Sequence, residues 1–206
     1  MATPPDCRAV PRRSKASAEK PGIGTLPAVD TPAYVHCRPG ETISHPRPGD
    51  IILVRHKHWL GWLIRCFVRI RHRAPEDRPY NYWTHAALVV SHTGQMVEVN
   101  ARGVVISHIW HYRESDYHYV WLDLPDAGRK AAVQFARSCL KQKYSLRNFL
   151  LLAATIALGD RVRMPDSGHG CVSLVARALQ EAGIRFDRKP TDMTPADLAK
   201  RFGVTP

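Results

Sequence analysis

A cysteine at the start of a predicted helix could act as a nucleophile. Cys171 follows the short Gly-containing stretch 167–170 and begins an amphipathic segment, 171–182, so the sequence predicts that it lies in the first turn of a helix. Unpaired N–H groups and the positive end of the helix dipole stabilise a thiolate there, and they can also hold the oxyanion formed when sulfur attacks a carbonyl. The alternative interpretation is a small buried side chain, which is the commoner fate of a free cysteine.

A histidine on a predicted strand could supply the base that such a cysteine needs. His85 lies in the segment 84–91, whose other members are mostly small or apolar, a pattern typical of a buried strand. An imidazole titrates near neutral pH and can remove the proton of a thiol. Alternatively, His85 is a core residue whose ring nitrogens are satisfied by its neighbours.

The loop that joins this strand to the next predicted strand decides which polar side chain can reach His85. Side chains alternate between the two faces of a strand, so Glu98 and Asn100 share one face of the segment 95–100. A four-residue loop at 91–94 sets His85 opposite Asn100. Glu98 then lies one diagonal step away, within reach of the imidazole. A two-residue turn would move Glu98 out of reach, and an odd-length loop would put it on the other face.

Strand-like and helix-like patterns occupy different parts of the chain. Short apolar or β-branched runs predict strands at 51–54, 84–91, 95–100, 103–109 and 117–124. Apolar residues at helical spacing predict helices at 58–70, 127–141, 146–158 and 171–182, and a short last helix begins at Thr194 and Pro195. Asp126 is expected to cap the second helix and Gly183 to follow the fourth. Grouped strands and grouped helices favour an α+β fold.

The length and the proline distribution predict one folded domain behind a tail. The chain has 206 residues, and nine of its 16 prolines fall within the first 48, among many Ser, Ala, Arg and Lys residues. Such a segment buries too little apolar surface to offset the entropy of ordering it, so residues 1–44 are expected to be a disordered basic tail. The domain is expected to span 45–206, and Pro48-Gly49-Asp50 is the turn signal near its start.

The charge balance favours anionic partners. Thirty Lys and Arg against 18 Asp and Glu give a formal net charge of +12, and the segment from Arg55 to Arg73 contains no acidic residue. An anionic surface could bind there, and the tryptophans of this segment would suit a membrane interface, although an ordinary helix covering the sheet is favoured. Aromatic residues gather at 110–119, but Glu114 and Asp116 dilute the charge, so no specific nucleic acid partner is predicted.

The cysteine pattern predicts neither a zinc ribbon nor a disulfide framework. The five cysteines are widely and irregularly spaced, with no Cys-x-x-Cys pair: Cys7, Cys37, Cys66, Cys139 and Cys171. The histidines at 56, 58 and 72 lack ligand spacing and are expected to be solvated, so no metal or cofactor is expected. The start of the chain lacks a secretory signal, and the longest apolar run, 149–158, is too short to span a bilayer. These features favour mostly free thiols in a reducing compartment, the cytoplasm by default, with signal-independent export as the alternative.

Several short motifs together resemble one family of cysteine hydrolases. The segments Thr-His-Ala-Ala-Leu-Val-Val, Gln-Met-Val-Glu-Val-Asn and Arg-Gly-Val-Val-Ile-Ser resemble the catalytic hairpin of NlpC-type papain-fold enzymes, and Gly-Asp-Ile-Ile-Leu resembles their Gly-Asp strand. The Gly-Cys-Val-Ser-Leu-Val helix and the trailing Thr-Pro-Ala-Asp-Leu also fit. Because the cysteine follows the hairpin, the order is similar to that of the circularly permuted branch, the YiiX-like proteins and, more distantly, lecithin–retinol acyltransferase. The resemblance covers roughly residues 48–203.

The resemblance implies a permuted papain-like fold, in which a small antiparallel sheet packs against helices and the nucleophile lies at a helix N-terminus. It makes Cys171 the nucleophile, His85 the general base, and Glu98 the residue that orients and charges the imidazole. Asn100 is the second candidate for the orienting position, because an amide fixes the tautomer without adding charge. His169 is a rival base, but it is so close to Cys171 along the chain that it is interpreted as a loop residue.

The function implied is a cysteine-dependent hydrolase of amide or ester bonds that works through a thioester. NlpC-type relatives commonly cut peptide amides of peptidoglycan, and the permuted branch includes enzymes that act on lipid-like substrates. The expected substrate is therefore a cell-wall peptide or a lipid-like acyl compound. An acyltransferase on the same fold is one alternative, because an alcohol or amine could intercept the thioester. A non-catalytic basic module that binds nucleic acid or an anionic membrane is the other.

Overall fold

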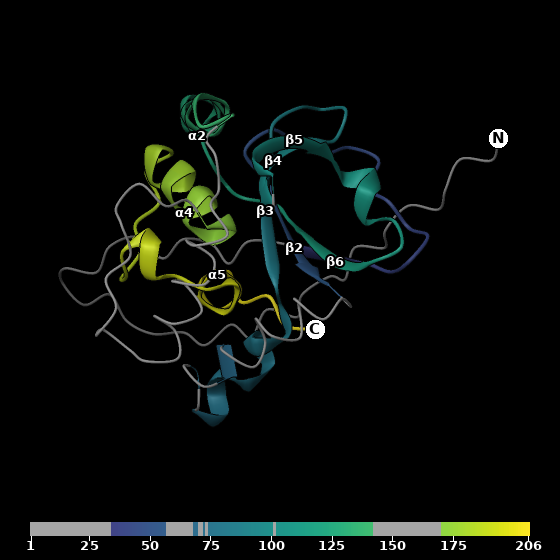
Figure 1. Cartoon of the computed structure of the whole chain (residues 1–206), viewed down its shortest axis with the longest axis vertical. Helices are drawn as coiled ribbons and strands as arrows, with labels where there is room; N and C mark the ends of the chain where they lie inside the picture. Colours follow the sequence, from purple (N-terminus) through teal and green to yellow (C-terminus); the bar gives the residue numbers. More distant parts are fainter. Residues whose placement is uncertain (1–33, 57–67, 70–71, 73, 101, 142–169) are drawn as a thin grey trace, which may run out of the picture.

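Six antiparallel strands form one sheet, with helices packed on one of its faces (Figure 1). The computed structural model describes residues 34–56, 68–69, 72, 74–100, 102–141 and 170–206. The strands are β1 (Tyr34–Cys37), β2 (Ile51–Arg55), β3 (His85–Val89), β4 (Gln95–Asn100), β5 (Gly103–His108) and β6 (Asp116–Val120). The α-helices are α2 (Asp126–Ser138), α4 (Cys171–Glu181) and α5 (Pro195–Arg201), and the 3-10 segments are η1 (Pro75–Tyr82), η2 (Ile109–Tyr112) and η4 (Pro190–Asp192). The predicted α+β class is confirmed.

The order of strands across the sheet is β1-β6-β2-β3-β4-β5. Alternate side chains of the central strands point to its two faces, as the pleat of a strand requires. On β3, Ala86 and Leu88 belong to the core shared with α4 and α5, whereas Ala87 and Val89 belong to a second core on the opposite face. That second core includes Tyr112 of η2. The sheet is therefore covered on both sides, and α4 packs directly against β3 and β4.

The first strand lies in a segment for which the sequence predicts disorder. β1 pairs with β6 over its whole length, from Tyr34 opposite Val120 to Cys37 opposite Tyr117. Its alternate residues Val35 and Cys37 are fully buried, so a short alternating pattern within a proline-rich stretch is enough to add an edge strand. The expectation of a disordered tail over 1–44 is therefore wrong for Tyr34–Cys37, which form a strand of the sheet. Residues 1–33 lie outside the described residues.

The thiols are not all free. Cys37 takes part in a disulfide bond, which contradicts the prediction at this position, whereas Cys139 and Cys171 are free. None of the described helices is long and apolar enough to cross a bilayer. Most of the basic segment from Arg55 to Arg73, with its tryptophans, lies outside the described residues.

The helix predicted at 127–141 differs from the structure at both ends, since it begins at Asp126 and ends at Ser138. The helix predicted at 127–141 is α2, but Asp126 is already its first residue and Pro125 occupies the cap position without a side-chain hydrogen bond. Asp126 still places a negative charge in the first turn, where the helix dipole favours it. The helices predicted at 58–70 and 146–158 lie almost entirely outside the described residues.

A buried carboxylate joins the sheet to α2. Asp50, which precedes β2, is fully buried and accepts hydrogen bonds from Arg129 of α2 at 2.9 Å and from the hydroxyl of Tyr119 at 2.8 Å. It also accepts the N–H of Leu122 at 3.0 Å. Because the N–H of Leu122 bonds to this carboxylate, it is not used for strand pairing. β6 accordingly ends at Val120, earlier than the strand predicted at 117–124.

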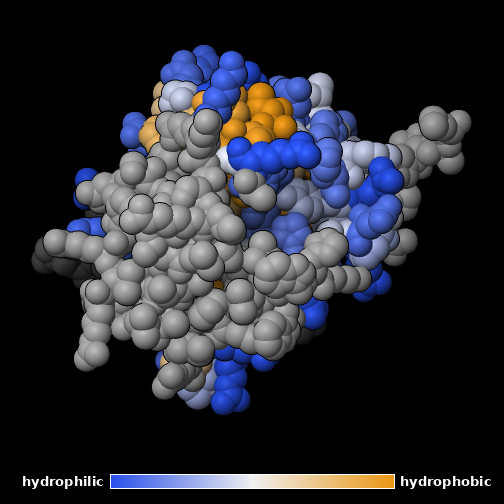
Figure 2. All heavy atoms as spheres, in the orientation of Figure 1, coloured by the Kyte–Doolittle hydropathy of each residue, from blue (hydrophilic) through white to orange (hydrophobic). Residues whose placement is uncertain are grey.

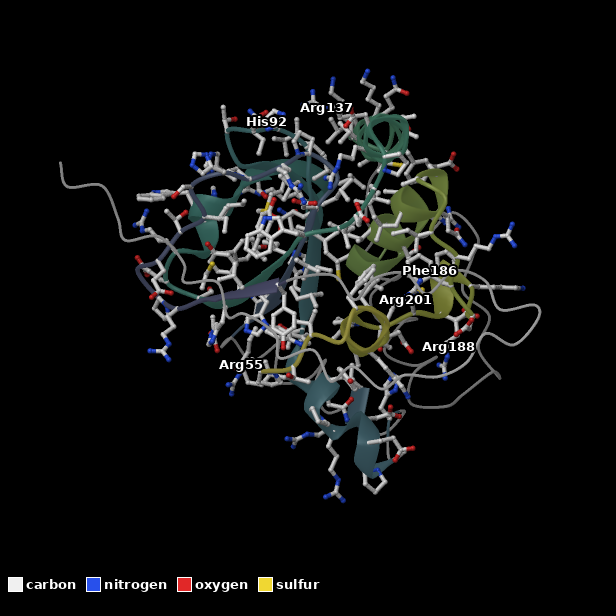
Figure 3. All side chains as sticks on the ribbon, turned by 180° about the vertical axis from the view of Figure 1, so that it is seen from behind. Arg55, His92, Arg137, Phe186, Arg188 and Arg201 are labelled. Atoms are coloured by element: carbon white, nitrogen blue, oxygen red, sulfur yellow. The ribbon has the colours of Figure 1, made fainter. Side chains whose placement is uncertain are left out.

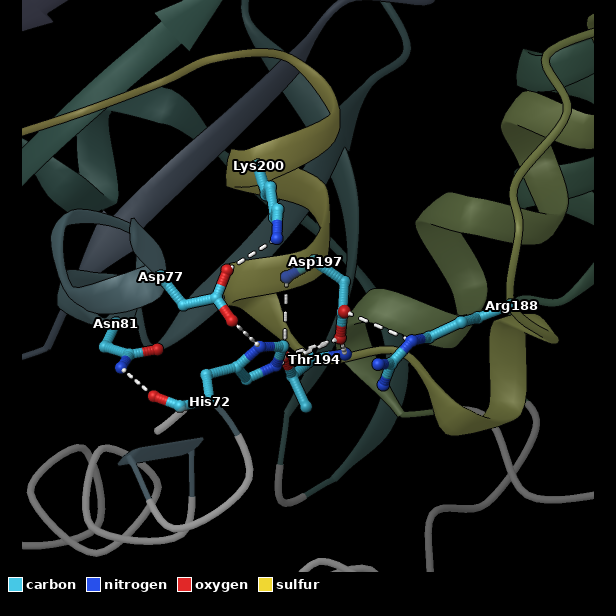
Figure 4. A network of polar contacts seen from close by, with 7 residues as sticks. All are labelled: His72, Asp77, Asn81, Arg188, Thr194, Asp197 and Lys200. Atoms are coloured by element: carbon cyan, nitrogen blue, oxygen red, sulfur yellow. Dashed lines mark hydrogen bonds and ion pairs between the residues drawn. The ribbon is translucent and has the colours of Figure 1, made fainter. Parts of the chain in front are cut away.

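A buried histidine ties the segment before β3 to α5 (Figure 4). Nε2 of His72 lies 3.1 Å from the hydroxyl of Thr194, which caps α5 together with Asp197, so the predicted start of this helix is confirmed. Nδ1 of His72 lies 3.6 Å from the carboxylate of Asp77 in η1, and Lys200 of α5 donates to the same carboxylate at 2.6 Å. The expectation of a solvated His72 is wrong, because the side chain is only 6% exposed.

The other end of the sheet is tethered to α2. In the view of Figure 2 the described surface is mostly hydrophilic, with a hydrophobic area between α2 and the β4–β5 side of the sheet. In Figure 3, seen from behind, Arg137 of α2 and His92 of the β3–β4 loop lie at the same end of the molecule. Nη2 of Arg137 donates to the carbonyl of Val90 at 3.3 Å, which fixes α2 against the hairpin that carries His85 and Glu98.

Candidate active site

The thiol of Cys171 is presented by the first turn of α4. Cys171 is the first residue of the helix, and Gly170 precedes it in an extended conformation without a side-chain cap. The amphipathic pattern that predicts this helix is confirmed, including its end, where Gly183 takes a positive φ of 92°. The residue is partly exposed, and the backbone N–H groups of Ala86 and Val172 are among the groups that stabilise its thiolate. Cys171 therefore lies among donors that favour a thiolate.

The imidazole of His85 lies between this thiol and a carboxylate. His85 is the first residue of β3, is 7% exposed and lies within electrostatic reach of Cys171. Its Nε2 lies 2.8 Å from Oε2 of Glu98, which is 6% exposed. Since an ionised carboxylate only accepts, Nε2 carries the proton of that bond, which leaves Nδ1 as the ring nitrogen for the sulfur.

The register that this contact needs is the one produced by the four-residue loop. Leu88 pairs with Val97, Val89 pairs with Met96, and the N–H of Val90 donates to the carbonyl of Gln95 at 2.8 Å. The loop is thus 91–94. A two-residue turn, the alternative that would have carried Glu98 out of reach, is excluded.

Asn100 is not the residue that contacts the imidazole. Its side chain is exposed, and its Oδ1 accepts the N–H of Arg102 at 2.8 Å. Of the two candidates for the orienting position, Glu98 is therefore the one brought against His85. The rival base His169 lies outside the described residues.

Two further residues surround the imidazole and were not anticipated as part of the site. The hydroxyl of Tyr112 donates to Oε2 of Glu98, the oxygen that also bonds His85. The ring of His56 lies 5.2 Å from that of His85 and 5.7 Å from that of Tyr112. The β2–β3 pairing of Val54 with His85 explains the place of His56, because residues two apart on a strand share a face. No sequence spacing links Tyr112 to the strands.

The electrostatics of the site favour a thiolate–imidazolium pair. Burial would lower the pKa of His85, but the negative charge of Cys171 and the hydrogen bonds to Cys171 and Glu98 outweigh it and raise the pKa to about 10. Burial would likewise raise the pKa of the Cys171 thiol, yet the charge and hydrogen bond of His85 lower it below its usual range. Glu98 has its pKa lowered to about 2, because the bonds from His85 and Tyr112 overcome its burial.

Such an arrangement supports nucleophilic chemistry at neutral pH. The thiolate is the reactive form of cysteine, and an adjacent imidazolium can return its proton to a leaving group. The backbone N–H groups at the start of α4 have no partner within the helix and can stabilise a developing oxyanion. Within the described residues, no three His, Cys, Asp or Glu side chains are grouped as ligands for a metal ion.

No protein-family model matches the chain, and no curated protein matches it.

Proposed function

We propose that the chain is a cysteine-dependent hydrolase of amide or ester bonds, built on a permuted papain-like fold with Cys171 as nucleophile. The observation that carries the proposal is the chain of contacts from the Cys171 sulfur through His85 to the buried carboxylate of Glu98. A structural cysteine needs no carboxylate-backed imidazole beside it, whereas a nucleophilic one requires a base that is itself oriented by a third group.

The first half of the reaction forms a thioester. The Cys171 thiolate attacks the carbonyl carbon of the substrate, and the carbonyl π pair moves onto oxygen, where the N–H groups of the first turn of α4 hold the charge. When the oxyanion collapses, the bond to the leaving nitrogen or oxygen breaks. The leaving group takes its proton from Nδ1 of the His85 imidazolium, and His85 becomes neutral.

The second half regenerates the enzyme. Neutral His85 takes a proton from water as its oxygen attacks the thioester carbonyl, and collapse of this second oxyanion breaks the C–S bond. The products are a carboxylic acid, the Cys171 thiolate and the His85 imidazolium, which is the starting state. If an alcohol or amine replaces water, the same steps transfer the acyl group. The substrate class that the resemblance favours is a cell-wall peptide or a lipid-like acyl compound.

A non-catalytic module for nucleic acid fits the aromatic residues less well. Base stacking needs exposed rings, yet Tyr112, Tyr117 and Tyr119 are at most 7% exposed and belong to the core of the sheet. Among the described hydrophobic side chains of this segment, Trp110 is the large one that is exposed, at 43%. The net charge of +12 remains available for attraction to an anionic surface or substrate.

The proposal is tested with p-nitrophenyl acetate, a small activated ester. We expect a burst of nitrophenolate equal to the protein concentration, with the acetyl group on Cys171 by peptide mass spectrometry. Cys171→Ala and His85→Gln should lose the burst, whereas Cys139→Ala and His92→Gln, matched substitutions away from the site, should keep it. A burst that survives in Cys171→Ala would contradict the proposal. Adding a primary amine and analysing the products separates water from amine as the final acceptor.

A further inference from the structure

Tyr112 reaches the site from an element that contains none of its other residues. It ends η2, the short 3-10 segment after β5, and it is only 7% exposed. Its hydroxyl donates to Oε2 of Glu98, and Nε2 of His85 donates to the same oxygen. Two donors on one oxygen restrain the rotation of the carboxylate about its last torsion more tightly than a single donor does.

We propose that Tyr112 is a positioning residue of this site, which holds the Glu98 carboxylate in line with the imidazole of His85. The inference rests on the proposed function, since it assigns Tyr112 a part in the same thiolate-forming relay. Supporting groups of this kind determine how well a reactive group is oriented, because the reactive group alone has several rotamers available.

The ring and the hydroxyl of Tyr112 contribute separately. The ring packs among its neighbours, 6.1 Å from the ring of His85 and 5.7 Å from that of His56. A phenylalanine keeps this packing and removes only the donor. Tyr112→Phe therefore tests the hydroxyl alone.

The hydroxyl keeps its proton throughout the working pH range. Burial raises the pKa of Tyr112 above its usual value, and the neighbouring charge of Glu98 raises it further. The Tyr112 hydroxyl therefore donates at every pH in this range, and the group whose protonation changes is Glu98. Without this donor, the buried carboxylate of Glu98 is less well stabilised, so it takes a proton at higher pH. A protonated Glu98 no longer stabilises the imidazolium, and the thiolate is lost with it.

The chain offers a matched control. Tyr119 is fully buried, and its hydroxyl also donates to a buried carboxylate, Asp50, at 2.8 Å. Asp50 lies at the start of β2, whereas Val54, which pairs with His85, lies near the opposite end of that strand. Tyr119→Phe thus removes a buried hydroxyl bond to a carboxylate, together with the bond that this hydroxyl accepts from the N–H of Arg47, without touching the site.

The experiment measures the rate of iodoacetamide alkylation of Cys171 against pH, by peptide mass spectrometry, in the full-length protein. In Tyr112→Phe we expect the acid limb of the profile to move to higher pH by about half a unit or more, and the rate of ester hydrolysis at pH 7 to fall about tenfold. Tyr119→Phe should keep the wild-type profile. An unchanged profile in Tyr112→Phe, or an equal shift in both variants, would overturn the inference alone.

Failure of the proposed function is distinguishable from this outcome. If the wild-type thiol titrates as an ordinary cysteine, the proposed function is wrong and the inference falls with it. A second readout needs no variant: the hydroxyl proton of Tyr112 should give a slowly exchanging, downfield NMR signal. Rapid exchange of that proton with water would contradict a fixed bond to Glu98, even if Tyr112→Phe does not fold.

Discussion

Nε2 of His85 and Oε2 of Glu98 lie 2.8 Å apart although the two residues are not opposite each other in the sheet. The register places them one diagonal step apart on neighbouring strands, a separation that only long side chains bridge. The contact therefore depends on the length of the loop that joins β3 and β4. It brings a full negative charge to the side of the imidazole that faces away from the thiol.

Removal of that charge should weaken the thiolate. In Glu98→Gln the pKa of His85 falls and the pKa of Cys171 rises, because the imidazolium loses its anionic partner. We expect alkylation of Cys171 at pH 6 to slow by about tenfold, the equivalent of one pKa unit. Glu114→Gln, whose side chain is 83% exposed, is the control and should react like the wild type. Equal rates in all three proteins would show that Glu98 does not act on the thiol.

Alkylation and turnover should respond differently to pH. The pKa of Cys171 is lowered, so the alkylation rate should rise with pH to a plateau whose midpoint lies below that of an ordinary cysteine. The pKa of His85 is raised to about 10, so the proton needed by the leaving group is present below that pH and is lost above it. Ester turnover should therefore fall on both sides, while alkylation should not fall at alkaline pH. An alkylation midpoint between pH 8 and 9 would contradict the ion pair.

Acid should destabilise the fold through a histidine outside the site. His118 on β6 is 1% exposed, neither ring nitrogen has a hydrogen-bond partner among the described residues, and its ring lies 4.6 Å from that of Trp83. Burial first, and the charge of His36 second, lower its pKa to about 3. The unfolded chain binds this proton near pH 6.5, so stability is fully present above that pH and is lost as the pH falls toward 3.

His118→Phe removes this titration and keeps an aromatic ring in place. Between pH 7 and pH 5 the wild type should lose about 2 kcal/mol of unfolding free energy through His118, and the variant should lose correspondingly less. Urea unfolding at the two pH values measures the difference, with His92→Phe in the exposed β3–β4 loop as the control. Parallel losses in wild type and His118→Phe would assign the acid sensitivity to other groups.

A glycine next to the buried Asp50 should tolerate no side chain. Gly49 has a φ of 91°, and a Cβ there would lie 3.1 Å from Cγ and 3.3 Å from Cα of Arg129. Gly40 has nearly the same φ, 92°, but a Cβ there meets nothing within 4 Å. Gly40→Ala should cost about 1 kcal/mol of backbone strain, and Gly49→Ala at least about 2 kcal/mol, because Arg129 must also move away from Asp50. Equal losses in thermal or urea unfolding would show that the contact with α2 does not matter.

The sequence predicts the helix and strands that carry the site better than it predicts how they are placed relative to one another. Periodicity is sufficient for α4, β3 and β4, because each has one apolar face that must be buried. It does not choose between loop lengths: the four-residue loop is closed by Ser91, whose hydroxyl accepts the N–H of Gln95, and by Gly94 with a φ of 88°. Neither feature is a unique signal for that turn.

Other parts of the structure depend on contacts between distant segments. β1 forms because it pairs with the edge of β6. The local composition does not show this pairing, and for that reason it predicts disorder. Tyr112 meets Glu98 because η2 folds back over the sheet, and within the sequence it is one of several aromatic residues without a distinguishing pattern. The buried environment of His72 likewise comes from α5, far along the chain.

The sulfur and the imidazole are carried by different layers, one by a helix and the other by a strand. Their separation is therefore set by how α4 rests on β3 and β4, through apolar side chains such as Leu174 and Leu88 that have no polar role. We therefore expect substitutions that repack the layers to alter the proton affinity of the thiol even when every polar residue is intact. The reactivity of the thiol thus depends on side chains that take no part in the chemistry.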